Sequence, residues 1–331
     1  MARVSALSAS HRGRVLAAFF AIYFIWGSTF LAVSFAIETL PPLMMASVRF
    51  LIAGGLLYAW ARRRGAARPM PVNWTSAVVV GGALILLGTG GAVWAQQRVP
   101  SGIIAMLATT VPLWIVLLDW LRPGGSRPTG RIVIGLAAGF AGIGILTGPA
   151  AMPGGVNIDR VGALVMLLAS FAWAAGSLYA RKARMSSCPL LSTAMQLLTG
   201  GALLMVAGLG MGEWRRFDIT QVSMASIWAL IFLTFGSLVA YTAYTWLMTV
   251  ESPARISTYA YVNPVVAVLL GWMFAGELLD TRTVLALGII LAGVVAINFP
   301  IIRKVAVESV APASDLVLEP DTPQPQAAGA T

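Results

Sequence analysis

Long apolar stretches alternate with short polar connections along most of this chain. Ten such stretches lie between residues 15 and 299, and each is about as long as a helix needs to cross a hydrocarbon core of about 30 Å. Charged residues, proline or glycine mark their ends. The pattern predicts an all-α integral membrane protein with ten transmembrane helices. The predicted spans cover residues 15–37, 43–61, 75–96, 101–121, 131–148, 161–180, 190–210, 224–248, 254–275 and 281–299.

Composition excludes several classes of protein. Of the 331 residues, 58% are hydrophobic and only 10% are charged, which is far from the balance of a soluble domain. The net charge of +10 comes from short basic clusters between apolar stretches, so we expect no nucleic-acid partner. A single cysteine, Cys188, excludes an internal disulfide, and a single histidine, His11, leaves no histidine-based metal site. We expect no metal, no cofactor and no enzymatic activity.

The distribution of basic residues predicts the orientation. Of the 22 lysines and arginines, 16 fall in connections on the side of the N-terminus, 5 fall on the other side, and Arg49 lies within a span. The positive-inside rule therefore places both termini in the cytoplasm. Residues 1–14 are a basic cytoplasmic tail, and residues 300–331, rich in proline, alanine and acids, are a disordered one. A cleaved signal peptide is the alternative for the first span, but its apolar stretch is longer than signal peptides usually have.

The two halves of the chain resemble one another. Val99-Pro100-Ser101 opens the fourth span and Pro112 lies within it; Ser252-Pro253-Ala254 opens the ninth and Pro264 lies within it, about 152 residues later. Residues 15–148 and 161–299 are therefore predicted to be two copies of a five-helix unit. Because five is odd, the second copy enters the membrane inverted, as in many secondary transporters. Duplication without transport is the alternative.

Four segments carry a resemblance to a known family: IWGST at 25–29, PPLMMASVRF at 41–50, VPSGI at 99–103 and YAYVNPVVAVLLG at 259–271. Together they resemble the EamA-type branch of the drug/metabolite transporter superfamily, most closely its YedA-like exporters. The resemblance implies two EamA repeats, a central cavity between them, and export of metabolites such as amino acids across a bacterial inner membrane. Members often carry an acid after the fourth and ninth helices. Glu277 fits the second position, whereas 122–125 holds no acid.

Aromatic and amide side chains at helical spacing are the candidates for solute binding. Tyrosine and tryptophan combine an apolar ring with a polar group, which suits amphipathic solutes, and a buried amide needs partners. The alternatives are core packing, an interfacial aromatic belt, or hydrogen bonds between helices. The predicted solute-binding residues are Trp26, Trp173, Tyr241, Tyr244, Tyr259 and Asn263.

Two prolines and two charges within spans are further candidates. Pro112 and Pro264 each remove a backbone donor, so they are predicted hinges, with passive kinks as the alternative. Arg49 is expected either to face the bundle interior with a partner or to snorkel to the outer surface, as a structural anchor or in contact with an anionic group on a solute. For Asp119 the alternatives are pairing with Arg122 and coupling to an ion or proton.

The favoured function is a secondary transporter, since no glycine-rich phosphate loop with a lysine suggests ATP as the energy source. A channel, an accessory membrane subunit and a membrane-embedded enzyme are the alternatives. The expected partners are a small-molecule solute and membrane lipid. Gly135 and Gly139 permit close helix approach, either between the two halves or between the protomers of a homodimer.

Overall fold

The protein is described here from a computed structural model, which describes residues 2–121, 130–147, 158–251 and 259–293. Within these ranges all regular secondary structure is helical. The elements in chain order are α1 (Ala2–Ala36), α2 (Pro42–Arg63), α3 (Pro71–Gly81), η1 (Gly82–Gly90), α4 (Gly91–Ala95), α5 (Ser101–Ala108), α6 (Val111–Leu121), α7 (Gly130–Thr147), α8 (Arg160–Ala180), α9 (Pro189–Gly210), α10 (Glu213–Arg216), η2 (Ile219–Gln221), α11 (Met224–Val250), α13 (Tyr259–Ala275) and a final described helix, Thr281–Gly293.

Local sequence accounts for where several helices begin. Pro42, Pro71 and Pro189 each occupy the first position of a helix, where the missing N–H costs nothing and the fixed φ favours helical backbone. Asp159 and Ser223 cap α8 and α11, because each side chain accepts a hydrogen bond from a backbone N–H of the first turn. These signals lie at the polar connections, so they confine each helix to its apolar stretch.

Seven helical stretches are long and apolar enough to cross a membrane. They run over His11–Ala36, Pro42–Arg63, Pro71–Ala95, Ser101–Leu121, Arg160–Ala180, Pro189–Gly210 and Met224–Tyr244. Three shorter apolar helices, Val133–Gly142, Val262–Ala275 and Thr281–Gly293, fall within the three other predicted spans. For the residues that the structure describes, the predicted all-helical architecture is confirmed, and the number of ten spans stays a prediction.

Three of the predicted spans differ in detail from the observed helices. The helix of the first span begins at Ala2, because no proline separates the basic segment from the apolar one. The third span changes to a nine-residue π-helix, η1, between α3 and α4. The fourth is two helices, α5 and α6, joined by a turn at Thr109 and Thr110. Local backbone geometry of this kind depends on the neighbouring helices, so apolar periodicity does not reveal it.

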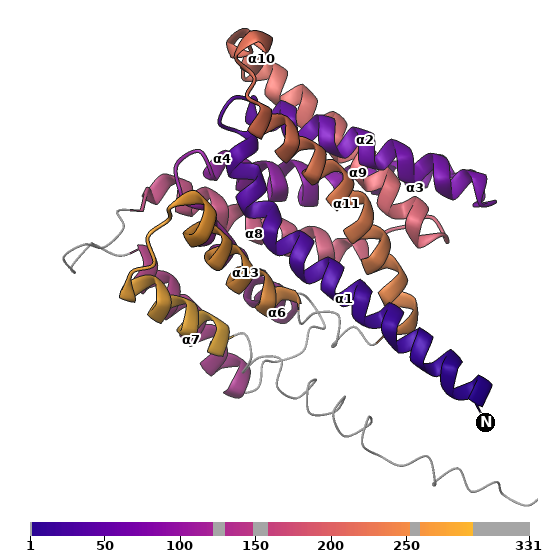
Figure 1. Ribbon diagram of the computed structural model, residues 1–331, viewed down its shortest axis with the longest axis horizontal. Helices are drawn as coiled ribbons and strands as arrows, with labels where there is room; N and C mark the ends of the chain where they lie inside the picture. Colours follow the sequence, from indigo (N-terminus) through magenta and orange to yellow (C-terminus); the bar gives the residue numbers. More distant parts are fainter. Residues whose placement is uncertain (1, 122–129, 148–157, 252–258, 294–331) are drawn as a thin grey trace, which may run out of the picture.

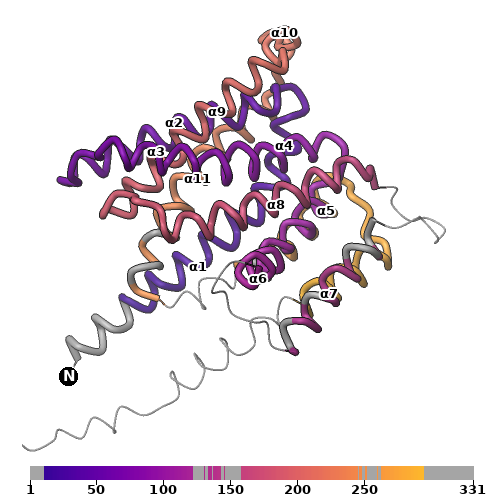
Figure 2. Tube along the Cα trace, turned by 180° about the vertical axis from the view of Figure 1, so that it is seen from behind, coloured from indigo at the N-terminus to yellow at the C-terminus, as the bar shows by residue number. Residues whose placement is uncertain are grey.

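Contacts between helices come in pairs that correspond in the two repeats. α2 packs on α9, its own counterpart, and α5 packs on α13. α1 packs against α11 and α13, while its counterpart α8 packs against η1 and α4, and against α6. In Figures 1 and 2, α2, α3 and α9 lie on one side of α1 and α11, and α6 and α7 lie on the other. The duplication seen in the sequence thus extends to the packing.

Glycines bring the last helix of each half together. A Cβ added at Gly293 would lie 2.6 Å from the Gly135 carbonyl oxygen and 2.9 Å from the Gly139 nitrogen. Such backbone proximity tolerates no side chain. Of the two alternatives for the Gly135 and Gly139 spacing, the structure shows contact between the halves of one chain, visible in Figure 1 as the yellow helix beside α7.

Candidate functional site

Four of the predicted solute-binding residues form an aromatic cluster inside the helix bundle. The Trp26 ring on α1 lies 5.7 Å from that of Tyr241, 5.3 Å from that of Tyr244 and 4.9 Å from that of Tyr259. Tyr241 and Tyr244 come from α11 and Tyr259 from α13, so three helices contribute. The Tyr241 and Tyr259 contacts with Trp26 are edge-to-face, the geometry that aromatic quadrupoles favour. We call these four residues the aromatic cluster.

Asn263 connects α13 to α1 beside the aromatic cluster. Its side chain is buried, and with the amide oriented by its surroundings the nitrogen donates to the carbonyl of Tyr23 at 3.2 Å and to that of Tyr259 at 3.1 Å. One turn along α1, a Cβ at Gly27 would lie 2.7 Å from that of Val266, so the two helices are in close contact there. The helix-to-helix role considered for Asn263 therefore has direct geometric support.

Arg49 is buried on α2 and faces the aromatic cluster. Its Nε donates to the Ser237 hydroxyl on α11 at 3.0 Å, and its Cζ lies 4.4 Å from the centre of the Phe50 ring. Tyr241 lies one turn beyond Ser237 on the same face of α11. A cation, two hydroxyls and the aromatic cluster are thus contiguous.

Trp173 occupies a different environment from the aromatic cluster. It lies on α8, and a Cβ added at Gly88 of η1 would be 2.9 Å from its Cε3. Trp173 and Trp26 are in the corresponding first helices of the two repeats, yet Trp26 meets tyrosines of α11 while Trp173 covers a glycine of the π-helix. The sequence suggested one surface containing both tryptophans; the structure places each of them against its own partner helix.

The two predicted hinge prolines have different local structures. Pro112 is in the first turn of α6, directly after the turn at Thr109 and Thr110, whose hydroxyls bond the carbonyls of Met106 and Leu107. Pro264 lies inside the continuous helix α13. Both prolines lie near the middle of their predicted spans, Pro264 inside a continuous helix and Pro112 directly after the break between α5 and α6, and their role as hinges stays a prediction.

Asp119 is half-buried near the end of α6. Arg122, its considered partner, lies outside the described residues. Among the residues that the structure describes, no three His, Cys, Asp or Glu side chains gather where they could hold a metal ion.

Two carboxylates bind helix N-termini of the opposite repeat. Glu277, after α13, accepts hydrogen bonds from the backbone N–H groups of Ser101 and Gly102 at the start of α5. Glu213, after α9, accepts from those of Leu43 and Met44 at the start of α2. At a helix N-terminus, a carboxylate accepts hydrogen bonds from backbone N–H groups that have no partner within the helix, and it interacts favourably with the positive end of the helix dipole. Sequence reasoning noted Glu277 through the resemblance and missed Glu213, whose only signal was an acid directly after an apolar stretch.

A third link between the repeats joins Arg98 to Asp159 at 3.1 Å. The side-chain hydrogen bond from Arg98, followed by the backbone N–H of Val161, holds the pKa of Asp159 below its ordinary value. Both residues lie in polar connections, where the pair orients the start of α8.

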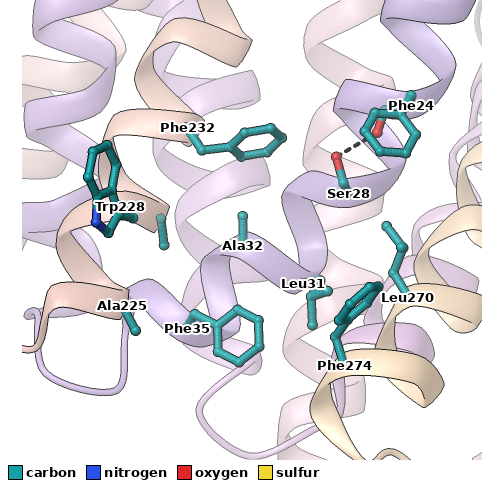
Figure 3. A pocket seen from close by; sticks show the side chains of 11 residues that line it. Phe24, Ser28, Leu31, Ala32, Phe35, Ala225, Trp228, Phe232, Leu270 and Phe274 are labelled. Atoms are coloured by element: carbon teal, nitrogen blue, oxygen red, sulfur yellow. Dashed lines mark hydrogen bonds between the residues drawn. The ribbon is translucent and has the colours of Figure 1, made fainter.

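An apolar groove of about 460 Å³ lies apart from these polar groups, between α1, α11 and α13 (Figure 3). Its one hydroxyl, on Ser28, donates to the Phe24 carbonyl. Trp228 and Phe274 line it and are largely exposed. Hydrocarbon walls open to the outside suit a lipid chain, so we do not place polar recognition in this groove.

The comparisons with known proteins agree with this architecture. Residues 13–148 and 160–299 each match the EamA-like transporter family. This chain belongs to that family. The chain is similar to the inner membrane transporter YedA of Escherichia coli (strain K12), with 38% identity over 284 residues, covering 85% of this chain and 89% of YedA. The transporter YvbV of Bacillus subtilis (strain 168) is 26% identical, covering 87% of this chain and 92% of YvbV.

A crystal structure shares the fold, with a TM-score of 0.60 at 21% identity, covering 88% of this chain and 99% of that one. The EamA membership and the named relatives make this chain a membrane transporter, not an enzyme, with a small-molecule solute and membrane lipid as its partners. Like YedA, it is a multi-pass protein of the inner membrane. The predicted family, class and location are confirmed.

Proposed function

We propose that this EamA protein is a secondary exporter of small amphipathic metabolites, such as amino acids, working by alternating access. It has ten spans in two inverted five-helix repeats, with both termini in the cytoplasm. The observation that carries the proposal is the paired packing of the two repeats around an interior that holds the aromatic cluster. Two similar halves can exchange arrangements, and such an exchange exposes one central site to either side in turn.

The polar contacts between the repeats support a conformation that is closed on the outer side of the membrane. With cytoplasmic termini, Glu213, Glu277 and the Arg98–Asp159 pair all lie on the outer side. Each joins segments from different halves, so together they hold the outer ends of the helices closed. This conformation is the one in which a cytoplasmic solute would enter.

The aromatic cluster supports the choice of solute class. Ring faces and hydroxyls bind an amphipathic solute by stacking and a few hydrogen bonds, which leaves the affinity low enough for release. This proposed surface consists of Trp26, Tyr241, Tyr244, Tyr259 and Asn263, whereas Trp173 lies against Gly88 of η1 and is not part of it.

Counterflow in proteoliposomes tests the proposal. Vesicles holding the purified full chain and loaded with unlabelled L-phenylalanine or L-tryptophan should transiently accumulate the same labelled amino acid, whereas protein-free vesicles should not. A channel would give equilibration without accumulation, and an accessory subunit alone would give neither. Trp26→Ala, compared with the lipid-facing control Trp228→Ala, should lose counterflow at equal protein content.

A further inference from the structure

Arg49 is a buried cation without a described carboxylate partner. Its side chain is only 7% exposed, seven residues inside α2. Among the residues that the structure describes, its hydrogen bond goes to the neutral Ser237 hydroxyl, and no carboxylate of these residues forms an ion pair with it. A charge at membrane depth normally has a counter-charge, because the desolvation cost is otherwise uncompensated.

The hydrogen-bonding capacity of the guanidinium points to a missing anion. Arginine has five N–H donors in a planar fork, and the bond to Ser237 uses only the one on Nε. Ser237 in turn donates to the Leu233 carbonyl at 2.7 Å, so this hydroxyl holds the guanidinium in position. The two terminal nitrogens then present four donors in the geometry that binds a carboxylate through both of its oxygens.

The neighbours of Arg49 indicate which groups, besides its negative charge, the bound anion should have. Tyr241 lies one turn beyond Ser237, which bonds the guanidinium, and its ring is 5.7 Å from that of Trp26. When a solute binds Arg49 through its carboxylate, the aromatic cluster of the protein therefore lies about one side-chain length away. Aromatic or otherwise apolar carboxylates satisfy both parts of such a site, whereas amines and neutral polar solutes leave the buried cation uncompensated.

We propose that Arg49 is the anion-binding group of the solute site and that this transporter selects small carboxylates with an apolar or aromatic body. This inference rests on the proposed function and specifies its solute class. Ser237 is a positioning residue, since it acts through Arg49.

Paired neutral and anionic probes test the inference by binding to the purified full chain in detergent. Phenylacetate and phenylacetamide have the same shape and differ in charge, as do indole-3-acetate and indole-3-acetamide. We expect the wild type to bind each carboxylate about tenfold or more tightly than its amide, measured by titration calorimetry. Equal affinities within both pairs, or binding of neither carboxylate, would overturn the inference.

Variants separate recognition from anchoring. Arg49→Gln should abolish the preference for carboxylates while leaving the melting temperature of the unliganded protein equal or higher, because an uncompensated buried charge is removed. Arg49→Lys should retain part of the preference, Ser237→Ala should weaken it a few-fold, and the exposed control Arg215→Gln should leave it intact. A marked fall in the melting temperature of Arg49→Gln, or an unchanged preference in it, would show that Arg49 is a structural anchor.

Counterflow distinguishes the two proposals. If the amino acids show counterflow but wild-type binding lacks any preference for the carboxylate probes, the transporter mechanism stands and the anion site is refuted. If no solute shows counterflow while the wild type prefers carboxylates and Arg49→Gln does not, the site stands and the carrier mechanism fails.

Discussion

The Glu277 carboxylate accepts hydrogen bonds from both the backbone N–H and the hydroxyl of Ser101, each at 2.6 Å. These residues are 176 positions apart and belong to different repeats. Because the bonds satisfy the first turn of α5, they join the connection after α13 in one half to the beginning of a helix in the other. In the proposed alternating-access mechanism, these contacts are among those that must break when the halves separate on this side.

Replacing Glu277 by glutamine should therefore weaken the outer contact. The amide keeps the shape but loses the charge and points an NH₂ group at donors, so we expect a loss of about 1–3 kcal/mol, seen as a lower melting temperature by scanning fluorimetry. Glu213→Gln should behave similarly. The control is Glu38→Gln, at an exposed position. An equal fall in its melting temperature would show that the loss of a negative charge, and not the loss of these contacts, lowers the stability.

Acid should weaken the contact between Arg98 and Asp159. The folded-state pKa of Asp159 lies below its ordinary value of 3.8, so its stabilising contribution is fully present above that value and is lost as the pH falls through the folded-state pKa. Asp159→Asn lacks this contribution at every pH. The difference in melting temperature between wild type and variant should shrink below about pH 4; a constant difference would contradict the pairing.

Cys188 reports the orientation. It directly precedes α9, is half-buried, and lies in a connection predicted to be cytoplasmic. An impermeant maleimide added to intact spheroplasts should leave it unlabelled and should label it after lysis. Arg216→Cys in a Cys188→Ala background should be labelled from outside, and the opposite pattern would reverse the topology.

The two prolines should differ in importance. Pro264→Ala gives α13 a backbone N–H that can pair with the carbonyl four residues earlier, so the helix stiffens and counterflow should fall at equal abundance. Pro112→Ala changes only the first turn of α6, after a break that the threonines already stabilise, so its effect should be smaller. Equal rates in wild type and Pro264→Ala would make this proline a passive kink.

Asn263→Leu tests whether the amide serves the solute or the helix pair. Both hydrogen bonds of its nitrogen go to backbone carbonyls, so the variant should lose stability. If the amide also bonds the solute, transport should weaken by roughly 1 to 3 kcal/mol in addition. Counterflow at limiting solute, compared with the melting temperature and with Trp26→Ala, separates the effects. Wild-type kinetics in both variants would place the binding site elsewhere.

Much of this protein could be predicted from its sequence. Apolar stretches of bilayer length indicate that lipid surrounds the helices, because this property depends on local composition. The basic connections predict an orientation, which the labelling of Cys188 tests. The resemblance between segments such as 99–103 and the EamA family was sufficient for the membrane-transporter class. Residues on one helix face, such as Ser237 and Tyr241, could also be grouped, since helical spacing alone determines their shared direction.

Only the tertiary structure decided which faces meet. It brought Trp26 to the tyrosines of α11 and α13 but placed Trp173 against Gly88, and it gave Arg49 a neutral partner from α11, 188 residues away. It also showed a turn before Pro112 and a capping role for Glu213. These features depend on how closely helices pack that are far apart in the sequence. The periodicity within one helix does not show which helix it packs against, nor which hydrogen-bond donors are left without a partner.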